Sequence, residues 1–131
     1  MLRMFAFALM ALLVLDGLWL GVLMKSFYRQ HLAPLARMAN GGLDPIWPIA
    51  AFVYPAIALG LTVFVLARWR TPMDALLMGA LFGALTYAVY DLTNHATLRD
   101  WSATMTVVDI GWGALSCGLT SWIVATATRA A

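Results

Sequence analysis

Four long runs of apolar residues dominate the chain, and short polar segments separate them. Each run is about 20 residues long, which is the length that an α-helix needs to cross the hydrocarbon of a bilayer. The runs cover residues 4–24, 47–67, 74–94 and 103–126. The pattern therefore predicts an all-α integral membrane protein, with one transmembrane domain that fills the chain.

The polar connectors decide how these helices are arranged. The second and third connectors are short, so consecutive helices must run antiparallel, and we predict an up-down-up-down bundle of four helices. Residues 25–46 and 95–102 then lie on one side of the membrane, the loop side. Both termini and residues 68–73 lie on the other, the terminus side. Four basic residues fall on each side, so the positive-inside rule gives no orientation. They are Lys25, Arg29, Arg37 and Arg99 against Arg3, Arg68, Arg70 and Arg129.

The first connector is long enough to hold structure of its own. Tyr28, Leu32, Leu35 and Ala39 recur at helical spacing, which predicts a short helix lying flat at the membrane interface. The sequence Asn40-Gly41-Gly42 is then expected to end that helix. An ordinary loop is the alternative interpretation, and the pattern does not choose between the two.

Two spans carry residues that shape helices. Pro55 lacks a backbone donor and predicts a kink near Tyr54 in the second span. In the third span Gly79 and Gly83 are four residues apart, and Gly113 lies in the fourth. Small residues let membrane helices approach closely, so we expect these glycines to form helix contacts, within the bundle rather than at a dimer face.

Composition supports the membrane assignment and removes other classes of protein. Hydrophobic residues make up 63% of the chain and charged residues 11%, far from the roughly 25% charge of soluble domains. The eight basic residues are scattered, which argues against a nucleic-acid surface. The single Cys117 permits neither an internal disulfide nor a Cys-x-x-Cys site. We therefore expect the lipid bilayer as the main partner and no nucleic acid.

Three aspartates fall inside the apolar spans, where an acid costs a few kcal/mol and must find a protein partner or water. They are Asp16, Asp91 and Asp109. Counting about 1.5 Å per residue from the loop-side ends of their helices places them at depths of about 12, 5 and 9 Å. All three are therefore expected in the loop-side half of the bundle.

Asp91 and Asp109 each have polar neighbours at helical spacing, so the third and fourth spans each have a polar face. On the third span this face comprises Tyr87, Tyr90, Asp91, Asn94 and His95. On the fourth it comprises Asp109, Trp112, Gly113, Ser116 and Thr120. Asp16 and Asp109 also share the pattern Asp-x-x-Trp, with Trp19 and Trp112 one turn beyond the acid. We predict one buried polar cluster that contains Asp16, Asp109 and the polar face of the third span.

Three interpretations of this cluster stay open. The aspartates can accept hydrogen bonds and fix the register of the helices. They can instead form a proton or cation site, with His95 or His31 as a shuttle. In a third interpretation, Asp91 and His95 bind Mg²⁺ or Mn²⁺ together with another of the carboxylates, as in a membrane enzyme. We assign no catalytic residue, no metal ligand and no cofactor.

Aromatic residues near the ends of the spans are typical of membrane-interface anchors. Trp47 begins the second span, Trp101 precedes the fourth, and Tyr28 lies in the first connector. We expect these three side chains at the level of the lipid headgroups.

Several of these motifs resemble a known family. The string from Tyr87 to Leu98, YAVYDLTNHATL, and the later string from Asp109 to Gly113, DIGWG, are similar to the signature of domain-of-unknown-function family 2177. The resemblance also includes Asp16-Gly17-Leu18-Trp19 and extends over nearly the whole chain. It implies a small four-helix protein of the bacterial inner membrane, and it carries no mechanism or catalytic residue.

Three functions are compatible with these observations, and we rank them. The first is a non-catalytic accessory or assembly subunit of a larger membrane complex. The second is proton- or cation-linked transport through a homo-oligomer that uses the buried aspartates. The third, a divalent-metal-dependent enzyme, is ranked last because no metal motif is present.

Overall fold

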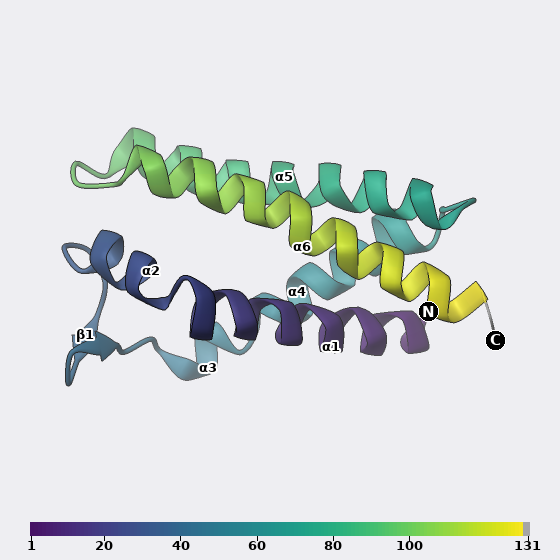
Figure 1. Ribbon diagram of the computed structural model, residues 1–131, viewed down its shortest axis with the longest axis horizontal. Coiled ribbons are helices and arrows are strands. Elements are labelled where there is room, and N and C mark those ends of the chain that lie inside the picture. The colour runs from purple at the N-terminus through teal and green to yellow at the C-terminus, as the bar shows by residue number, and fades with distance from the viewer. Residues whose placement is uncertain (130–131) are drawn as a thin grey trace.

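The computed structural model describes residues 1–129, and it confirms the predicted all-α membrane architecture. Within this range four helical segments are long and apolar enough to span a bilayer. They are Leu2–Leu23, Trp47–Leu66, Pro72–Thr97 and Ala103–Arg129. Figure 1 shows them running along one common axis, and the first helix begins at the end of the molecule where the last helix ends.

Two of the four spans change helix type along their length. The first is α1 (Leu2–Leu18) followed by the π-helical turn η1 (Trp19–Leu23). The second is α3 (Trp47–Ala50), α4 (Val53–Gly60) and the π-helical segment η2 (Leu61–Leu66). The third and fourth are the continuous helices α5 (Pro72–Thr97) and α6 (Ala103–Arg129).

The helices α5 and α6 form the most extensive contact in the bundle. Three glycines permit it, because their backbones meet the opposite helix directly. A Cβ atom on Gly83 would overlap the carbonyl oxygen of Gly113, and one on Gly79 would lie 2.6 Å from the carbonyl oxygen of Cys117. The Gly79-x-x-x-Gly83 face therefore packs inside the bundle.

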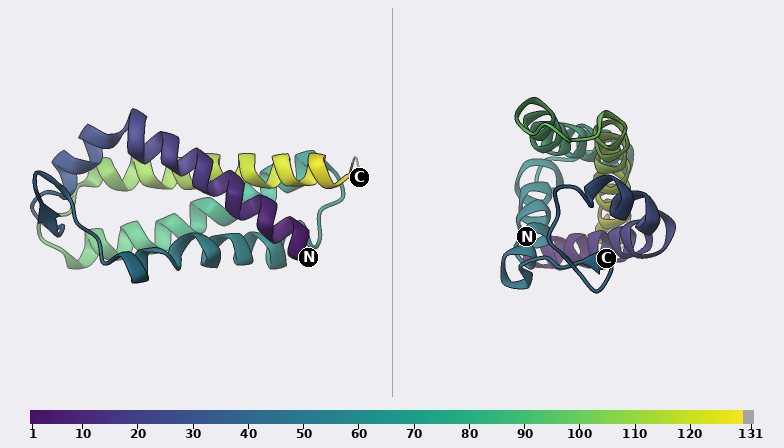
Figure 2. Two further views of the ribbon diagram at one scale, coloured as in Figure 1. Left: turned by 90° about the horizontal axis from the view of Figure 1, so that it is seen from below. Right: turned by 90° about the vertical axis from the view of Figure 1, so that its left-hand side faces the viewer.

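The other helices close the bundle around this pair. The helix α1 packs against α6 and α4, and η2 contacts both α5 and α6. The end-on view of Figure 2 shows the four spans placed around a common centre. Buried apolar side chains fill the terminus-side half, and we call this group the apolar core. It comprises Ala8, Leu12, Ala58, Leu61, Val65, Leu66, Cys117 and Val124.

The first connector contains a helix and a hairpin. The helix α2 (Lys25–Leu32) supports the expected short helix, but it ends well before Ala39. Pro34 follows closely, and proline disfavours helix at the residue before it. Asn40 (φ 51°) and Gly41 (φ 75°) form the turn between β1 (Met38–Ala39) and β2 (Gly42–Leu43). The prediction that this sequence ends a helix is wrong, since Asn-Gly is the usual pair of a tight hairpin turn.

The break in the second span lies slightly upstream of the predicted kink. The helix α3 ends at Ala50 and α4 begins at Val53, so the interruption covers Ala51 and Phe52 rather than Tyr54. Pro55 explains the shift, because the carbonyl it leaves without an i→i−4 donor is that of Ala51.

Candidate functional site

The three intramembrane aspartates meet in the loop-side half of the bundle, each supplied by a different helix. Asp16 of α1 is 2% exposed, Asp91 of α5 is fully buried, and Asp109 of α6 is half-buried. The Asp91 and Asp109 carboxyl groups lie close enough to act on each other electrostatically, although no hydrogen bond joins them. Asp16 lies close enough to interact electrostatically with Asp109. We call Asp16, Asp91 and Asp109 the aspartate cluster.

The two Asp-x-x-Trp motifs interlock across the contact between the first and fourth spans. The indole nitrogen of Trp112 donates to Asp16 Oδ1. In the other direction, Trp19 Nε1 donates to the hydroxyl of Tyr28 at 3.2 Å, and that hydroxyl donates to Asp109 Oδ1. The two indoles stack with their centroids 4.3 Å apart and their planes 2° from parallel. Asp16 is therefore hydrogen-bonded directly to Trp112, the tryptophan of the other motif. Asp109 is linked to Trp19 through the hydroxyl of Tyr28.

Tyr28 reaches Asp109 because α2 packs against the loop-side end of the bundle. Tyr28, Trp101 and Met105 form a small buried cluster, against which Trp19 and Met24 also pack. Burial, together with the hydrogen bond to Asp109, raises the pKa of the Tyr28 phenol. At neutral pH the group is consequently a hydrogen-bond donor without charge.

Two of the three predicted interface anchors are covered by the protein itself. Tyr28 and Trp101 are buried among protein side chains, and Trp101 Nε1 donates to Thr106 Oγ1 at 3.0 Å. Their position along the chain suggested the membrane surface, but the fold of α2 covers them. Trp47 is 70% exposed at the start of α3 and remains a predicted anchor.

Several carboxyl oxygens of the cluster have no hydrogen-bond partner within residues 1–129. These are both oxygens of Asp91 and Oδ2 of Asp16. In the same described range, no lysine or arginine is among the groups that act on the three carboxyls. Buried carboxyl groups need a counter-charge, a proton or water. These oxygens therefore need a proton, a cation or water that residues 1–129 do not supply.

A cavity of about 160 Å³ adjoins the cluster, between α1, α2, α5 and α6. Asp16, Tyr28, Tyr87, Asp109 and Trp112 are among the residues that line it. At roughly 30 Å³ for each molecule, this space holds about five waters. Two of the three aspartates, Asp16 and Asp109, therefore border a space large enough for water.

The predicted polar face of α5 divides between the inside and the outside of the bundle. Tyr87 is half-buried and lines the cavity. Tyr90 also lines it, although it is 59% exposed, and it makes an edge contact with Trp101. Asn94 is half-buried beside Tyr90. His95 lies in the last turn of α5 and is exposed. His95 is thus not part of the buried cluster.

No set of three or more His, Cys, Asp or Glu side chains among residues 1–129 is placed to hold a metal ion. The metal interpretation required Asp91 and His95 on one face. Asp91 is fully buried and His95 is exposed.

Sequence analysis did not find two features of the site. One is the hydrogen-bonded link from Trp19 through Tyr28 to Asp109, which depends on how α2 packs against the bundle. The other is that two hydroxyls of α6, those of Ser116 and Thr120, are fully buried and have no hydrogen-bond partner in the described range. Both residues follow Trp112 at helical spacing. Their spacing was visible in the sequence, but their unpaired state was not.

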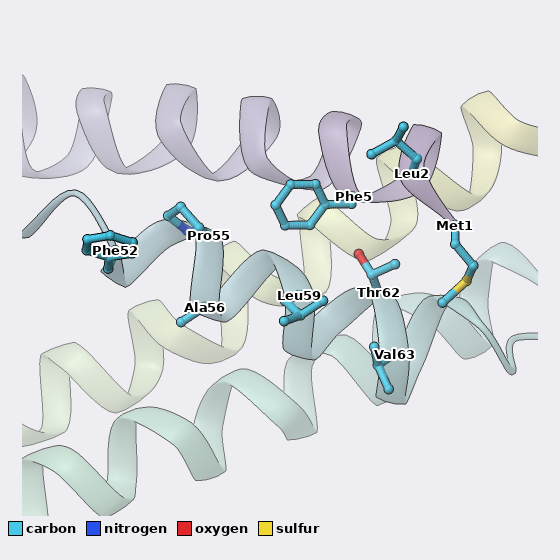
Figure 3. Close-up of a pocket in the computed structure, with 9 residues that line it drawn as sticks. All are labelled: Met1, Leu2, Phe5, Phe52, Pro55, Ala56, Leu59, Thr62 and Val63. Carbon is cyan, nitrogen blue, oxygen red and sulfur yellow. The ribbon is translucent and has the colours of Figure 1, made fainter.

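A larger concavity, of about 610 Å³, lies between the start of α1 and the second span. Figure 3 shows the side chains that line it, such as Phe5, Phe52 and Leu59. Its one polar side chain, Thr62, donates its hydroxyl to the carbonyl of Ala58 at 2.7 Å. This apolar groove therefore offers shape but no free polar group.

Comparison with known proteins gives a family and no closer relative. Neither the curated proteins nor the solved structures contain a match to the chain. The family model described as predicted membrane protein (DUF2177) matches residues 1–126, nearly the full length. This match agrees with the four apolar spans, and the chain therefore belongs to family DUF2177 of predicted membrane proteins.

Proposed function

We propose that this protein carries out proton-linked transport, with the aspartate cluster as its proton-binding site. The observation that supports this is the pairing of Asp91 with Asp109. Two carboxyl groups lie side by side in a buried position, with no lysine or arginine among their neighbours in residues 1–129.

The repulsion between Asp91 and Asp109 depends on how many protons the two carboxyl groups carry. Two neighbouring buried carboxyl groups repel each other unless at least one of them carries a proton. Loss of that proton leaves two like charges next to each other, a repulsion that is strong where water is scarce. Because Asp91 belongs to α5 and Asp109 to α6, binding or release of one proton changes the force between these two helices.

The small cavity narrows the choice of transported species. A space of about 160 Å³ accommodates a few waters and a proton but not a large solute. The proton is therefore our choice, and any larger co-substrate would need a path between copies of the chain.

The experiment measures proton flux into liposomes that contain the purified protein and a pH-sensitive dye. We expect flux with the unaltered chain, and its loss in Asp91→Asn and Asp109→Asn, which keep the side-chain shape. The matched control is Asp44→Asn, because Asp44 is an exposed acid outside the spans. Flux equal to that of empty liposomes, or full flux in Asp91→Asn, would reject the proposal.

A second candidate is the accessory or assembly subunit. The apolar groove between α1 and the second span supports it, because a transmembrane helix of another chain could fill this concavity (Figure 3). Co-purification with a defined larger complex in mild detergent tests this role. Replacement of Ala56, a small groove residue, by Trp should release the partner. Isolation of the native protein only as a free species would count against it.

A further inference from the structure

Threonines in membrane helices commonly satisfy their hydroxyl on their own helix, at the carbonyl one turn earlier. Most of the threonines within the spans of this protein do so. The hydroxyls of Thr62, Thr86, Thr97, Thr126 and Thr128 each donate to the carbonyl four residues earlier, at 2.7–2.8 Å. This bond leaves the hydroxyl unavailable as a donor to other groups.

Two hydroxyls in the centre of the bundle differ. Ser116 and Thr120 are fully buried in α6, and neither has a hydrogen-bond partner within the described chain. They are available to groups in the interior of the bundle. Ser121 is also unpartnered, but it packs against Gly79 of α5 and lies on another face of the helix.

The position of these hydroxyls connects them to the aspartate cluster. At 100° per residue, Asp109, Trp112, Ser116 and Thr120 fall within an arc of about 80° on α6. Trp112 donates to one oxygen of Asp16, and the other oxygen of Asp16 has no partner. Ser116 therefore follows the Trp112–Asp16 contact by one helical turn, and Thr120 follows by two.

The line of polar groups covers a large part of the membrane but does not cross it. From Asp109 to Thr120 it extends about 16 Å, roughly half of the 30 Å hydrocarbon layer. One turn beyond Thr120, the buried residue of α6 is Val124, which packs in the apolar core with Leu61 and Leu66. The polar line thus begins at the loop-side cavity, which Asp109 and Trp112 line, and ends at an apolar layer.

We propose that Ser116 and Thr120 form a proton relay, which extends the aspartate cluster toward the terminus side and which the apolar core closes. Successive groups stand about one helical turn apart, too far for direct hydrogen bonds, and the hydroxyls are sealed from water in this structure. The relay therefore conducts only when water enters the centre of the bundle and bridges the groups. A hydroxyl accepts a proton on its oxygen and releases its own proton to the next oxygen, so that each group returns to its starting composition. This inference rests on the proposed function, because the relay serves the aspartate cluster.

The test compares three variants of α6 in proteoliposomes. Thr120→Val removes the hydroxyl and nearly keeps the side-chain shape, and Thr120→Ser restores the hydroxyl. Thr126→Val is the matched control, because the Thr126 hydroxyl is exposed and donates to the carbonyl of Trp122. We expect proton flux to fall severalfold in Thr120→Val and to stay near the original level in the other two variants. Ser116→Ala should resemble Thr120→Val.

A second measurement separates the relay from the proposed function. Infrared spectroscopy of the carboxyl C=O band records whether the aspartates take up protons, independently of flux. We expect this band to titrate in Thr120→Val as in the unaltered protein, because the relay lies beyond the cluster. Full flux in Thr120→Val, or lost flux in Thr120→Ser, would overturn the relay alone. Absence of both flux and a titrating band in the unaltered protein would overturn the proposed function and the relay with it.

Discussion

The two halves of the bundle are built from different chemistry. In the terminus-side half the buried residues of the apolar core are mostly Ala, Leu and Val, and they come from three of the four spans. In the loop-side half they are Asp16, Asp91, Tyr28 and Trp101, with stacked indoles and a cavity between them. Dense packing holds membrane helices together, whereas buried carboxyl groups weaken a structure unless something binds to them. The terminus-side half therefore contributes mainly to stability, whereas the loop-side half holds the ionisable groups and the cavity.

The largest effect is expected at the crossing of α5 and α6, on which both halves depend. Gly83→Ala places a methyl group against the carbonyl of Gly113, and we expect a loss of about 3 kcal/mol in the free energy of unfolding. Gly111→Ala on α6 is the control, because a Cβ atom there has open space. Thermal unfolding in detergent measures both. Equal stability of the two variants would show that the glycine contact is not essential.

A packing defect in the apolar core should have the next largest effect. Leu61→Ala leaves a cavity in this core, and we expect a loss of about 2 kcal/mol, the lower end of the range for buried leucines. The lower end applies because lipid, unlike water, already solvates an apolar side chain. Leu59→Ala on the same span is the exposed control and should change little. Proton flux should survive in both variants.

Removal of a polar contact in the loop-side half should cost less stability. Trp112→Phe deletes the hydrogen bond to Asp16 and keeps an aromatic ring against Trp19, so we expect a loss of about 1.5 kcal/mol. Trp122→Phe, at an exposed position of the same helix, provides the control. Function should respond more than stability, because Asp16 loses its donor. A variant with normal flux would weaken the division between the two halves.

The smallest effect concerns Tyr28 and is visible in its pH dependence. Because the pKa of this phenol is raised in the folded protein, its contribution is complete below the ordinary tyrosine pKa of about 10 and is lost as pH rises through the folded value. We expect Tyr28→Phe to lose about 1 kcal/mol at neutral pH and to show a flatter decline in alkali. Melting temperatures measured between neutral and alkaline pH provide the comparison. Parallel curves for the two proteins would contradict it.

The four spans could be predicted because run length is a property of each segment alone. The common depth of the aspartates could also be derived, since a rise of 1.5 Å per residue gives the depth of each acid without tertiary information. Neither prediction needed to know which helices touch. The observed span Pro72–Thr97 extends only a few residues beyond the expected run at either end.

Other features depend on contacts between segments and could not be predicted in this way. Tyr28 and Trp101 are buried because α2 packs against the loop-side end of the bundle. The stacking of Trp19 on Trp112 follows from the register between the first and fourth spans. The hairpin was different, because its Asn40-Gly41 signal was present in the sequence but was interpreted as a helix end.

The same hairpin has a practical use. Its tip, Asn40 and Gly41, is exposed and lies outside the four spans, where short insertions are usually tolerated. A small epitope placed there, detected by an antibody in intact and in opened cells, would report which compartment this end of the protein faces. That assignment would in turn show which compartment lies nearest the cavity beside the aspartate cluster, an orientation that the balanced arginines and lysines leave undetermined.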